Sequence, residues 1–348
     1  MNRINYLDGH RGIAILLVIF FHAYSRWSEI LPYGDKFSTF PLFEYGFLGV
    51  QLFFILSGFV ILMTLDKCNT IQGFIYQRWL RLFPAMLACS VIIYISSGFF
   101  FERPLGEPLA KNLLPGLIFV EPYVLTKLTG INFQSLEGPF WSLYVEFKFY
   151  VIAALIYFWI GSKNLVIALF LCSIVCFFLA KIAPNSDNIF LINLDSVMVL
   201  LSGKHFGWFA AGAAFYLFTK SGNKAWYLFG LFICVISSAM LAYQSKSIAT
   251  FIAIIVLISV FVLSLTSVKL QHILSHKFLL YLGFISYPLY LLHENMMISI
   301  ILKFSAVIPA NLSFLLPIFA IIFISFIAYL VAKYIEKSIK KTLLYFLI

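Results

Sequence analysis

Long apolar segments recur along the whole chain and constrain its fold more than any other feature. A helix needs about 20 mostly apolar residues to cross a hydrocarbon core of about 30 Å. Ten segments approach that length, over residues 12–26, 46–65, 82–101, 140–161, 165–182, 206–219, 225–243, 248–268, 279–302 and 308–332. Of the 348 residues, 62% are hydrophobic and only 11% are charged, which is far from the composition of a soluble domain. The sequence therefore predicts an all-α polytopic membrane protein with about ten transmembrane helices, in a single membrane domain over residues 1–348.

The distribution of Lys and Arg between the predicted loops indicates how the chain is oriented. These residues concentrate in the cytoplasmic loops of membrane proteins. With the N-terminus inside, fourteen fall on the inner side and nine on the outer side, and the acidic residues show the opposite bias. We expect both termini in the cytoplasm, a longer outer loop over residues 102–139 and a short cytoplasmic tail over residues 333–348. Apolar stretches at 113–125 and 189–201 suit re-entrant or interfacial helices.

Composition and motifs exclude several function classes. The formal net charge is +10, but the cations are scattered between apolar runs rather than clustered on one face, so we expect no nucleic acid partner. Cys172 and Cys176 are four residues apart in an apolar segment without a nearby His or acidic residue, and we interpret them as packing rather than as metal ligands. The signatures of the common soluble enzyme classes are absent from the sequence.

Ionisable residues inside the predicted spans mark a bundle interior or a water-filled path, because they are costly in lipid. Away from the ends of the spans there are five of them: His22, Glu146, Lys148, His293 and Glu294. Arg11 precedes His22 by eleven residues, so the two share one helix face about 16 Å apart along the axis. The alternative is that Arg11 only anchors the helix at the cytoplasmic headgroups, with His22 as a structural histidine.

Two further polar stripes reach a similar predicted depth. Ser142, Glu146 and Tyr150 follow one another at intervals of four residues in the fourth span. A second stripe in the ninth span comprises Ser286, Tyr290 and His293. Matched depth on three segments favours a shared polar site, whereas separate interhelical hydrogen bonds are the alternative.

Two arginines stand three residues apart before the third predicted span, on its cytoplasmic side. Arg78 and Arg81 would share one helix face. Guanidinium groups recognise phosphate in a bidentate manner, so the pair predicts a phosphate contact, and anionic lipid headgroups are the alternative ligand.

Five segments follow one another along the chain: YLDGHRGIAILLVIFFH, GVQLFFILSGFVI, FIYQRWLRLFP, FWSLYVEFKFY and ISYPLYLLHE. In this order they resemble the acyltransferase-3 family of membrane acyltransferases, which modify bacterial surface glycans. The resemblance is nearest to the stand-alone polysaccharide O-acetyltransferases, including those that act on lipopolysaccharide O-antigen. It implies that the family's functional positions are Arg11, His22, Arg78, Arg81, Glu146, Ser286, Tyr287, Tyr290 and His293. Lys148 departs from the pattern, because many members have a glutamine-like residue there.

The residue pattern and the resemblance together predict an acetyl-CoA-dependent O-acyltransferase of the bacterial cytoplasmic membrane. Acyl-CoA would be bound through its phosphates by Arg11, Arg78 and Arg81. His22 would act as general base on an acceptor hydroxyl, with Glu146 orienting the imidazole. Supporting polar groups would be Ser142, Tyr150, Ser286, Tyr290 and His293. We expect no permanently bound cofactor and no metal, and as partners a lipid-linked or surface glycan and membrane lipids.

Two other functions stay open on sequence alone. The same basic inner face and buried histidines would suit a proton-coupled transporter or flippase for a lipid-linked sugar. A non-catalytic subunit of a glycan-export assembly is the second alternative. Within the enzyme hypothesis, a covalent acyl-histidine relay is a variant of direct transfer.

Overall fold

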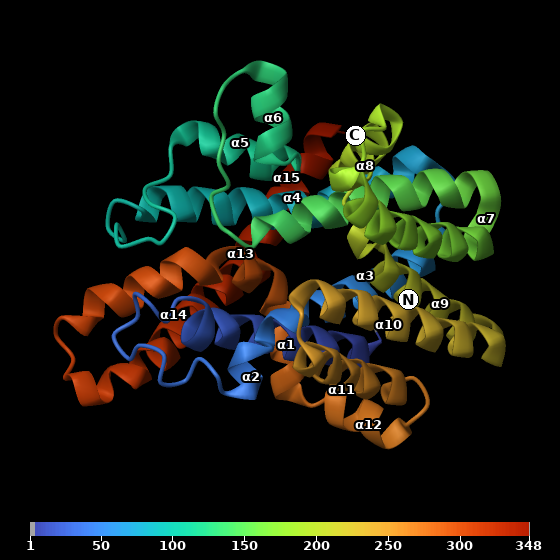
Figure 1. Ribbon diagram of the computed structural model, residues 1–348. Coiled ribbons are helices and arrows are strands. Elements are labelled where there is room, and N and C mark those ends of the chain that lie inside the picture. Colours follow the sequence, from blue (N-terminus) through green and yellow to red (C-terminus); the bar gives the residue numbers. More distant parts are fainter. Residues whose placement is uncertain (1–3, 348) are drawn as a thin grey trace. The chain divides into compact units, whose positions relative to one another are not determined.

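The computed structural model describes residues 4–347, and all regular secondary structure in this part of the chain is helical. The α-helices are α1 (Asn5–Phe21), α2 (Pro41–Glu44), α3 (Gly49–Leu65), α4 (Ile71–Ser96), α5 (Leu113–Ile118), α6 (Pro122–Thr129), α7 (Phe140–Ile182), α8 (Ile189–Leu200), α9 (Phe206–Ser221), α10 (Lys224–Ser245), α11 (Ile248–Ser264), α12 (Val268–Leu274), α13 (Lys277–Ser305), α14 (Leu316–Leu330) and α15 (Glu336–Leu347) (Figure 1).

The predicted all-α polytopic class is confirmed. Among residues 4–347, six helical stretches are long and apolar enough to cross a membrane, or up to eight if each of two bent helix pairs is one span. The sequence-based number of ten differs for two physical reasons. It divides α7 into two spans at Gly161, where the backbone leaves the helical region with φ 82° and ψ 173°. It also includes α13, whose hydropathy is lowered by His293, Glu294 and Asn295 near its middle.

Several predicted boundaries differ from those of the helices in the structure. The third predicted span was expected to begin at residue 82, but α4 begins at Ile71, so Arg78 and Arg81 lie inside this helix rather than before it. The predicted outer loop over residues 102–139 contains α5 and α6, separated at Phe119, which has a left-handed backbone conformation. The predicted tail is helical from Glu336 to Leu347. The orientation of the termini across the membrane stays a prediction.

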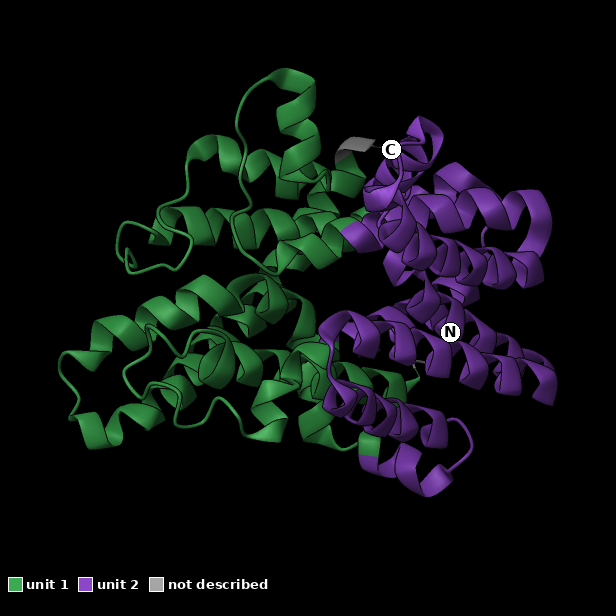
Figure 2. Ribbon diagram, viewed as in Figure 1, with its two compact units in different colours: residues 1–49, 79–144, 274–348 green, residues 50–78, 145–273 purple. Residues whose placement is uncertain are grey.

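The chain divides into two compact units, each assembled from segments that are distant in sequence (Figure 2). Unit 1 comprises Met1–Gly49, Trp79–Tyr144 and Leu274–Ile348, and unit 2 comprises Val50–Arg78 and Val145–Ile273. Helices α4 and α7 therefore each contribute residues to both units. The assignment of residues 1–348 to one functional domain stays a prediction.

Unit 1 is organised around the close packing of α1 against α13 (Figure 1). Gly12 on α1 and Gly283 on α13 make this approach possible. A Cβ on Gly12 would overlap the backbone carbonyl of Leu279, and one on Gly283 would overlap that of Asp8. Gly9 lies in the same way against the carbonyl of Leu274, which ends α12. Small residues at such contacts let helix backbones approach closely, which is how membrane helices gain packing energy without a hydrophobic driving force.

Unit 2 has its own aromatic core and an ionic tie at one end. The ring of Phe209 stacks on Phe54 at 4.7 Å and on Phe149 at 3.9 Å between centroids. Asp66, directly after α3, accepts hydrogen bonds from Tyr157, Tyr216 and Lys220, which come from two other helices. Burial raises the pKa of the Asp66 carboxyl, but these hydrogen bonds outweigh burial and leave it below its usual value.

Candidate active site

His22 begins a π-helical turn, His22–Arg26, that follows directly on α1. Such turns are rare and frequently occur at functional sites. The imidazole is 13% exposed, and its Nδ1 lies 2.8 Å from the carbonyl oxygen of Val18. A carbonyl oxygen only accepts hydrogen bonds, so Nδ1 is the nitrogen that has the proton. The other nitrogen, Nε2, is therefore the one that can exchange a proton with a neighbour.

The neighbour of Nε2 is a carboxylate on α13. Glu294 Oε1 lies 3.4 Å from His22 Nε2 and accepts a hydrogen bond from Trp27 Nε1 at 3.2 Å. The Glu294 side chain is only 6% exposed. With Nδ1 protonated, this contact is favourable either as a carboxylate beside an imidazolium or as a carboxylic acid donating to a neutral imidazole. The two side chains can thus share one proton.

His293 completes the cluster from the same helix. Its Nδ1 lies 2.9 Å from the carbonyl oxygen of Tyr290, which makes Nδ1 a donor and leaves Nε2 as an acceptor. This Nε2 faces His22 Nδ1 at 3.2 Å, with the two ring centroids 4.7 Å apart. The structure thus brings together His22 and His293, which sequence analysis placed on separate spans at matched depth.

The second oxygen of Glu294 has no hydrogen-bond partner in the described part of the chain. Gly138 lies against it, because a Cβ at that position would overlap Glu294 Oε2. A buried, unsatisfied carboxylate oxygen is costly, so it marks a place where a donor from a ligand or a water would be stabilising.

A second polar group lies where the start of α7 meets α13. Ser142 Oγ is 2.8 Å from the Tyr290 hydroxyl, and both hydroxyls lie within 3.2 Å of the carbonyl oxygen of Pro139. These two residues were predicted to support a site and do contact each other. Ser286 instead donates to the Gly283 carbonyl oxygen of its own helix.

Glu146 belongs to unit 2, whereas His22 belongs to unit 1. Its Oε1 accepts hydrogen bonds from Ser57 at 2.7 Å and from the Tyr150 hydroxyl at 2.6 Å. Glu146 thus contacts Tyr150, which lies on the same polar stripe of the fourth predicted span. Glu146 as the residue that orients His22 stays a prediction, while Glu294 is a carboxylate that the structure does place on His22.

The three arginines proposed for acyl-CoA have different surroundings. Arg11 Nη1 is 2.8 Å from Asp8 Oδ1 on the same helix. Arg78 donates from Nη2 to Thr64 Oγ1 at 2.9 Å and lies 5.8 Å from the centroid of the Phe74 ring, whereas Arg81 is exposed. A guanidinium has five N–H donors and can contact several acceptors at once. The role of the three arginines in acyl-CoA binding stays a prediction.

Lys148, the departure from the family pattern, has a structural partner within unit 2. Its Nζ donates to the Leu200 carbonyl oxygen at 2.8 Å and to Ser202 Oγ at 2.6 Å. Leu200 ends α8, so the ammonium donates a hydrogen bond to a carbonyl at the C-terminus of that helix and interacts favourably with its partial negative charge.

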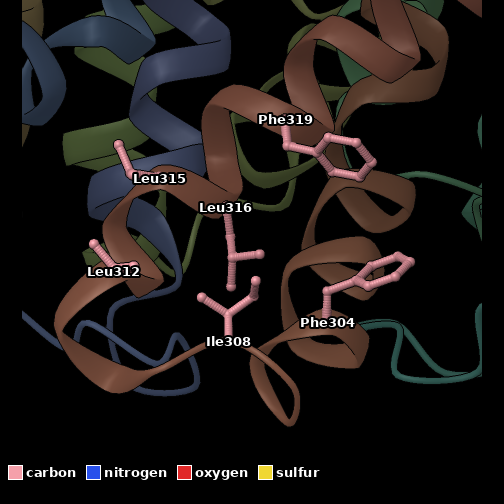
Figure 3. A pocket seen from close by; sticks show the side chains of 6 residues that line it. All are labelled: Phe304, Ile308, Leu312, Leu315, Leu316 and Phe319. Carbon is pink, nitrogen blue, oxygen red and sulfur yellow. The ribbon is translucent and has the colours of Figure 1, made fainter.

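An apolar pocket of about 320 Å³ lies where α13 connects to α14 (Figure 3). Its lining side chains are Phe304, Ile308, Leu312, Leu315, Leu316 and Phe319. None of these side chains can exchange a proton or bind a charge. The pocket suits a hydrocarbon chain and is not part of the His22 cluster.

Comparison with known proteins gives consistent results. A family model described as an acyltransferase domain matches residues 4–333. An O-acetyl transferase of Shigella phage Sf6 is 25% identical over 250 residues, which are 70% of this chain and 71% of that protein. The peptidoglycan O-acetyltransferase OatA of Listeria monocytogenes is 29% identical over 157 residues, and the match spans 42% of this chain but only 23% of that longer protein. No solved structure matches this chain significantly.

Proposed function

Because the chain belongs to the acyltransferase-3 family, we propose that it transfers an acetyl group from acetyl-CoA in the cytoplasm to a hydroxyl of an extracytoplasmic glycan. O-antigen is the glycan we favour, and the bacterial inner membrane is the location we expect. Support comes from the family match and from relatives that are named as O-acetyltransferases.

The single observation on which the mechanism depends is the arrangement of His22. Its Nδ1 proton is held by the Val18 carbonyl oxygen, and its Nε2 faces Glu294. In the proposed step, Nε2 removes the proton of the glycan hydroxyl while that oxygen attacks the thioester carbonyl carbon of acetyl-CoA. The carbon–sulfur bond then breaks, and the leaving thiolate takes the proton from the imidazolium. Glu294 would stabilise the imidazolium, which is how an adjacent carboxylate assists a histidine base.

Substrate binding follows from charge. Arg11, Arg78 and Arg81 would bind the phosphates of acetyl-CoA, because guanidinium groups form strong bidentate contacts to phosphate. Glu294 Oε2, the buried oxygen that has no partner in the described part of the chain, would accept a hydrogen bond from a second hydroxyl of the glycan, since the reacting hydroxyl donates its one proton to His22 Nε2.

The test is His22→Gln in the full-length protein, with glycan O-acetylation normalised to the amount inserted in the membrane. A general base contributes 10² to 10⁴ in rate, so turnover should fall by at least ~10²-fold while acetyl-CoA still binds. His10 lies on the same helix and is 1% exposed, so His10→Gln controls for the loss of a buried histidine. Acetylation near the wild-type level in His22→Gln would overturn the proposal.

The transporter or flippase alternative predicts a different pattern. The His22, His293 and Glu294 cluster could also relay protons. In that case the purified protein would move a lipid-linked sugar across a vesicle membrane without consuming acetyl-CoA. Thiol release from acetyl-CoA by the purified protein therefore separates the two functions.

A further inference from the structure

Glu137 lies in the segment before α7, and its side chain is fully buried. Its Oε1 is 3.1 Å from Arg103 Nη2, while its Oε2 accepts hydrogen bonds from the backbone nitrogen of Asn295 at 2.9 Å and from Asn295 Nδ2 at 2.7 Å. All three contacts come from donors. These three contacts favour Glu137 as a carboxylate, since a carboxylic acid proton would have no acceptor among these partners.

The network continues to two backbone groups. Arg103 Nη2 also donates to the Leu136 carbonyl oxygen at 2.8 Å, and Asn295 Oδ1 accepts a hydrogen bond from the Leu105 nitrogen at 3.1 Å. Three segments that are far apart in sequence are thus joined: the one after α4, the one before α7 and the middle of α13.

Stability alone does not account for this network. A buried ion pair loses about as much in desolvation as it gains in attraction, and apolar replacements of similar volume are often neutral or stabilising. What distinguishes the pair is its position, because Asn295 directly follows His293 and Glu294 on α13. Gly138, the residue after Glu137, lies against Glu294 Oε2. Glu137 therefore restrains the residues next to Glu294 from two sides.

We propose that Arg103, Glu137 and Asn295 form a positioning network that holds His293 and Glu294 in register with His22 for acyl transfer. None of the three is a catalytic residue, because each acts through its neighbours. The inference rests on the proposed function, since it assigns the network to the same reaction.

The charged groups that face Glu137 are Arg103, from the segment after α4, and Glu294, from α13; Glu294 in turn contacts His22. Burial raises the pKa of Glu137 to about 8, although the Arg103 charge and the Asn295 hydrogen bonds lower it, and the Glu294 charge adds to the rise. Since the positioned form contains the carboxylate, turnover should increase with pH until Glu137 is ionised.

The experiment measures thiol release from acetyl-CoA by the full-length protein in membranes of its host, between pH 6 and pH 9.5. In wild type, kcat should rise toward a plateau above about pH 8. In Glu137→Gln, kcat at pH 9 should fall by ~10²-fold, as expected for a displacement of about 1 Å. The rise with pH should also disappear, while KM for acetyl-CoA stays within twofold. Arg103→Lys keeps the charge without the guanidinium fork. In this variant kcat should still rise with pH, but the rise should occur at higher pH because the contact that favours the Glu137 carboxylate is weaker.

Asp66→Asn is the matched control, because Asp66 is also a carboxylate with three hydrogen-bond donors. It should lower the melting temperature and leave the pH profile unchanged. If Glu137→Gln keeps the wild-type kcat and the wild-type rise, the network proposal is wrong. If Glu137→Gln fails to fold, the test is Arg103→Lys. A pH profile of kcat equal to that of wild type in Arg103→Lys would then overturn the proposal. His22→Gln is measured in parallel. Wild-type turnover in His22→Gln refutes the proposed function itself. Loss of turnover in His22→Gln together with wild-type turnover in Glu137→Gln refutes only the network.

Discussion

Substitution of Gly12 by Ala tests whether the close packing of α1 on α13 sets the geometry of the site. A Cβ on Gly12 would lie 2.5 Å from the Leu279 carbonyl oxygen, 3.2 Å from Leu282 Cβ and 3.3 Å from the Gly283 nitrogen. Two of these atoms are backbone, so no side-chain rotation relieves the overlap. Reaching an ordinary contact of about 3.4 Å requires α1 to move by about 0.9 Å from α13.

A shift of this size should be costly for the reaction and moderate for the fold. Overpacking costs about 1–3 kcal/mol, whereas a misplacement of about 1 Å at reacting groups can cost ~10²-fold in rate. We therefore expect kcat to fall 10- to 100-fold, which corresponds to about 1.4–2.7 kcal/mol of activation free energy. His22 should lose contact with Glu294, since the two lie on the helices that separate.

The assay is acetyl-CoA-dependent glycan O-acetylation per inserted protein, with thermal unfolding measured on the same preparation. Gly98→Ala is the control, because no atom lies within 4 Å of a Cβ at that position. It should leave both rate and melting temperature unchanged. Wild-type turnover in Gly12→Ala, with the expected loss of stability, would refute the argument that helix separation sets the catalytic geometry.

Three further predictions concern donor binding, α8 and pH. Arg78→Ala and Arg81→Ala should each raise KM for acetyl-CoA about 10-fold or more, since a charge-assisted hydrogen bond contributes about 1.5–3 kcal/mol; an unchanged KM in steady-state kinetics would favour lipid anchoring instead. Lys148→Met should lower hydrogen-exchange protection across α8 by ~10-fold or more, because that helix has no buried residues of its own and loses the ammonium at Leu200; equal protection would contradict the anchoring. The third prediction follows from the pKa of Glu137, which is raised in the folded state to about 8. The protonated carboxyl stabilises the fold fully below the unfolded pKa of Glu137, and this stabilisation is lost as pH rises from that value through about 8. The melting temperature should therefore fall between these two pH values in wild type but not in Glu137→Gln.

The sequence predicted the helical class and part of the site because both follow from local rules. Ionisable residues in apolar spans are few, and this rule alone selected His22, His293 and Glu294 as unusual. It could not say which of these side chains meet. Glu146 was paired with His22 on estimated depth, and that pairing stays a prediction. In the structure Glu146 accepts hydrogen bonds from Ser57 and Tyr150, and Glu294 is a carboxylate beside His22.

The positioning network could not be predicted from the sequence for a different reason. Arg103 and Glu137 are 34 residues apart in a predicted loop, where no helical period relates one position to another. Charged residues in such a loop are normally solvated, so the sequence does not predict that Arg103 and Glu137 are buried. The glycines of α1 were a usable signal, because Gly9 and Gly12 are separated by one turn on a single face. Their spacing would have identified the side of α1 that packs closely, though not α13 as its partner.

The glycines and the polar cluster depend on each other physically. Polar groups within a span are stabilised only if they find partners inside the protein, and side chains as short as imidazole and carboxylate reach each other only where backbones approach closely. Gly12 and Gly283 provide that approach, and His22 and Glu294 use it. Close approach also limits water around the pair, which strengthens its electrostatic interaction relative to an exposed pair. The same packing that allows α1 and α13 to associate therefore makes His22 Nε2 and Glu294 Oε1 able to share a proton, so helix association and base chemistry cannot be altered independently at this contact.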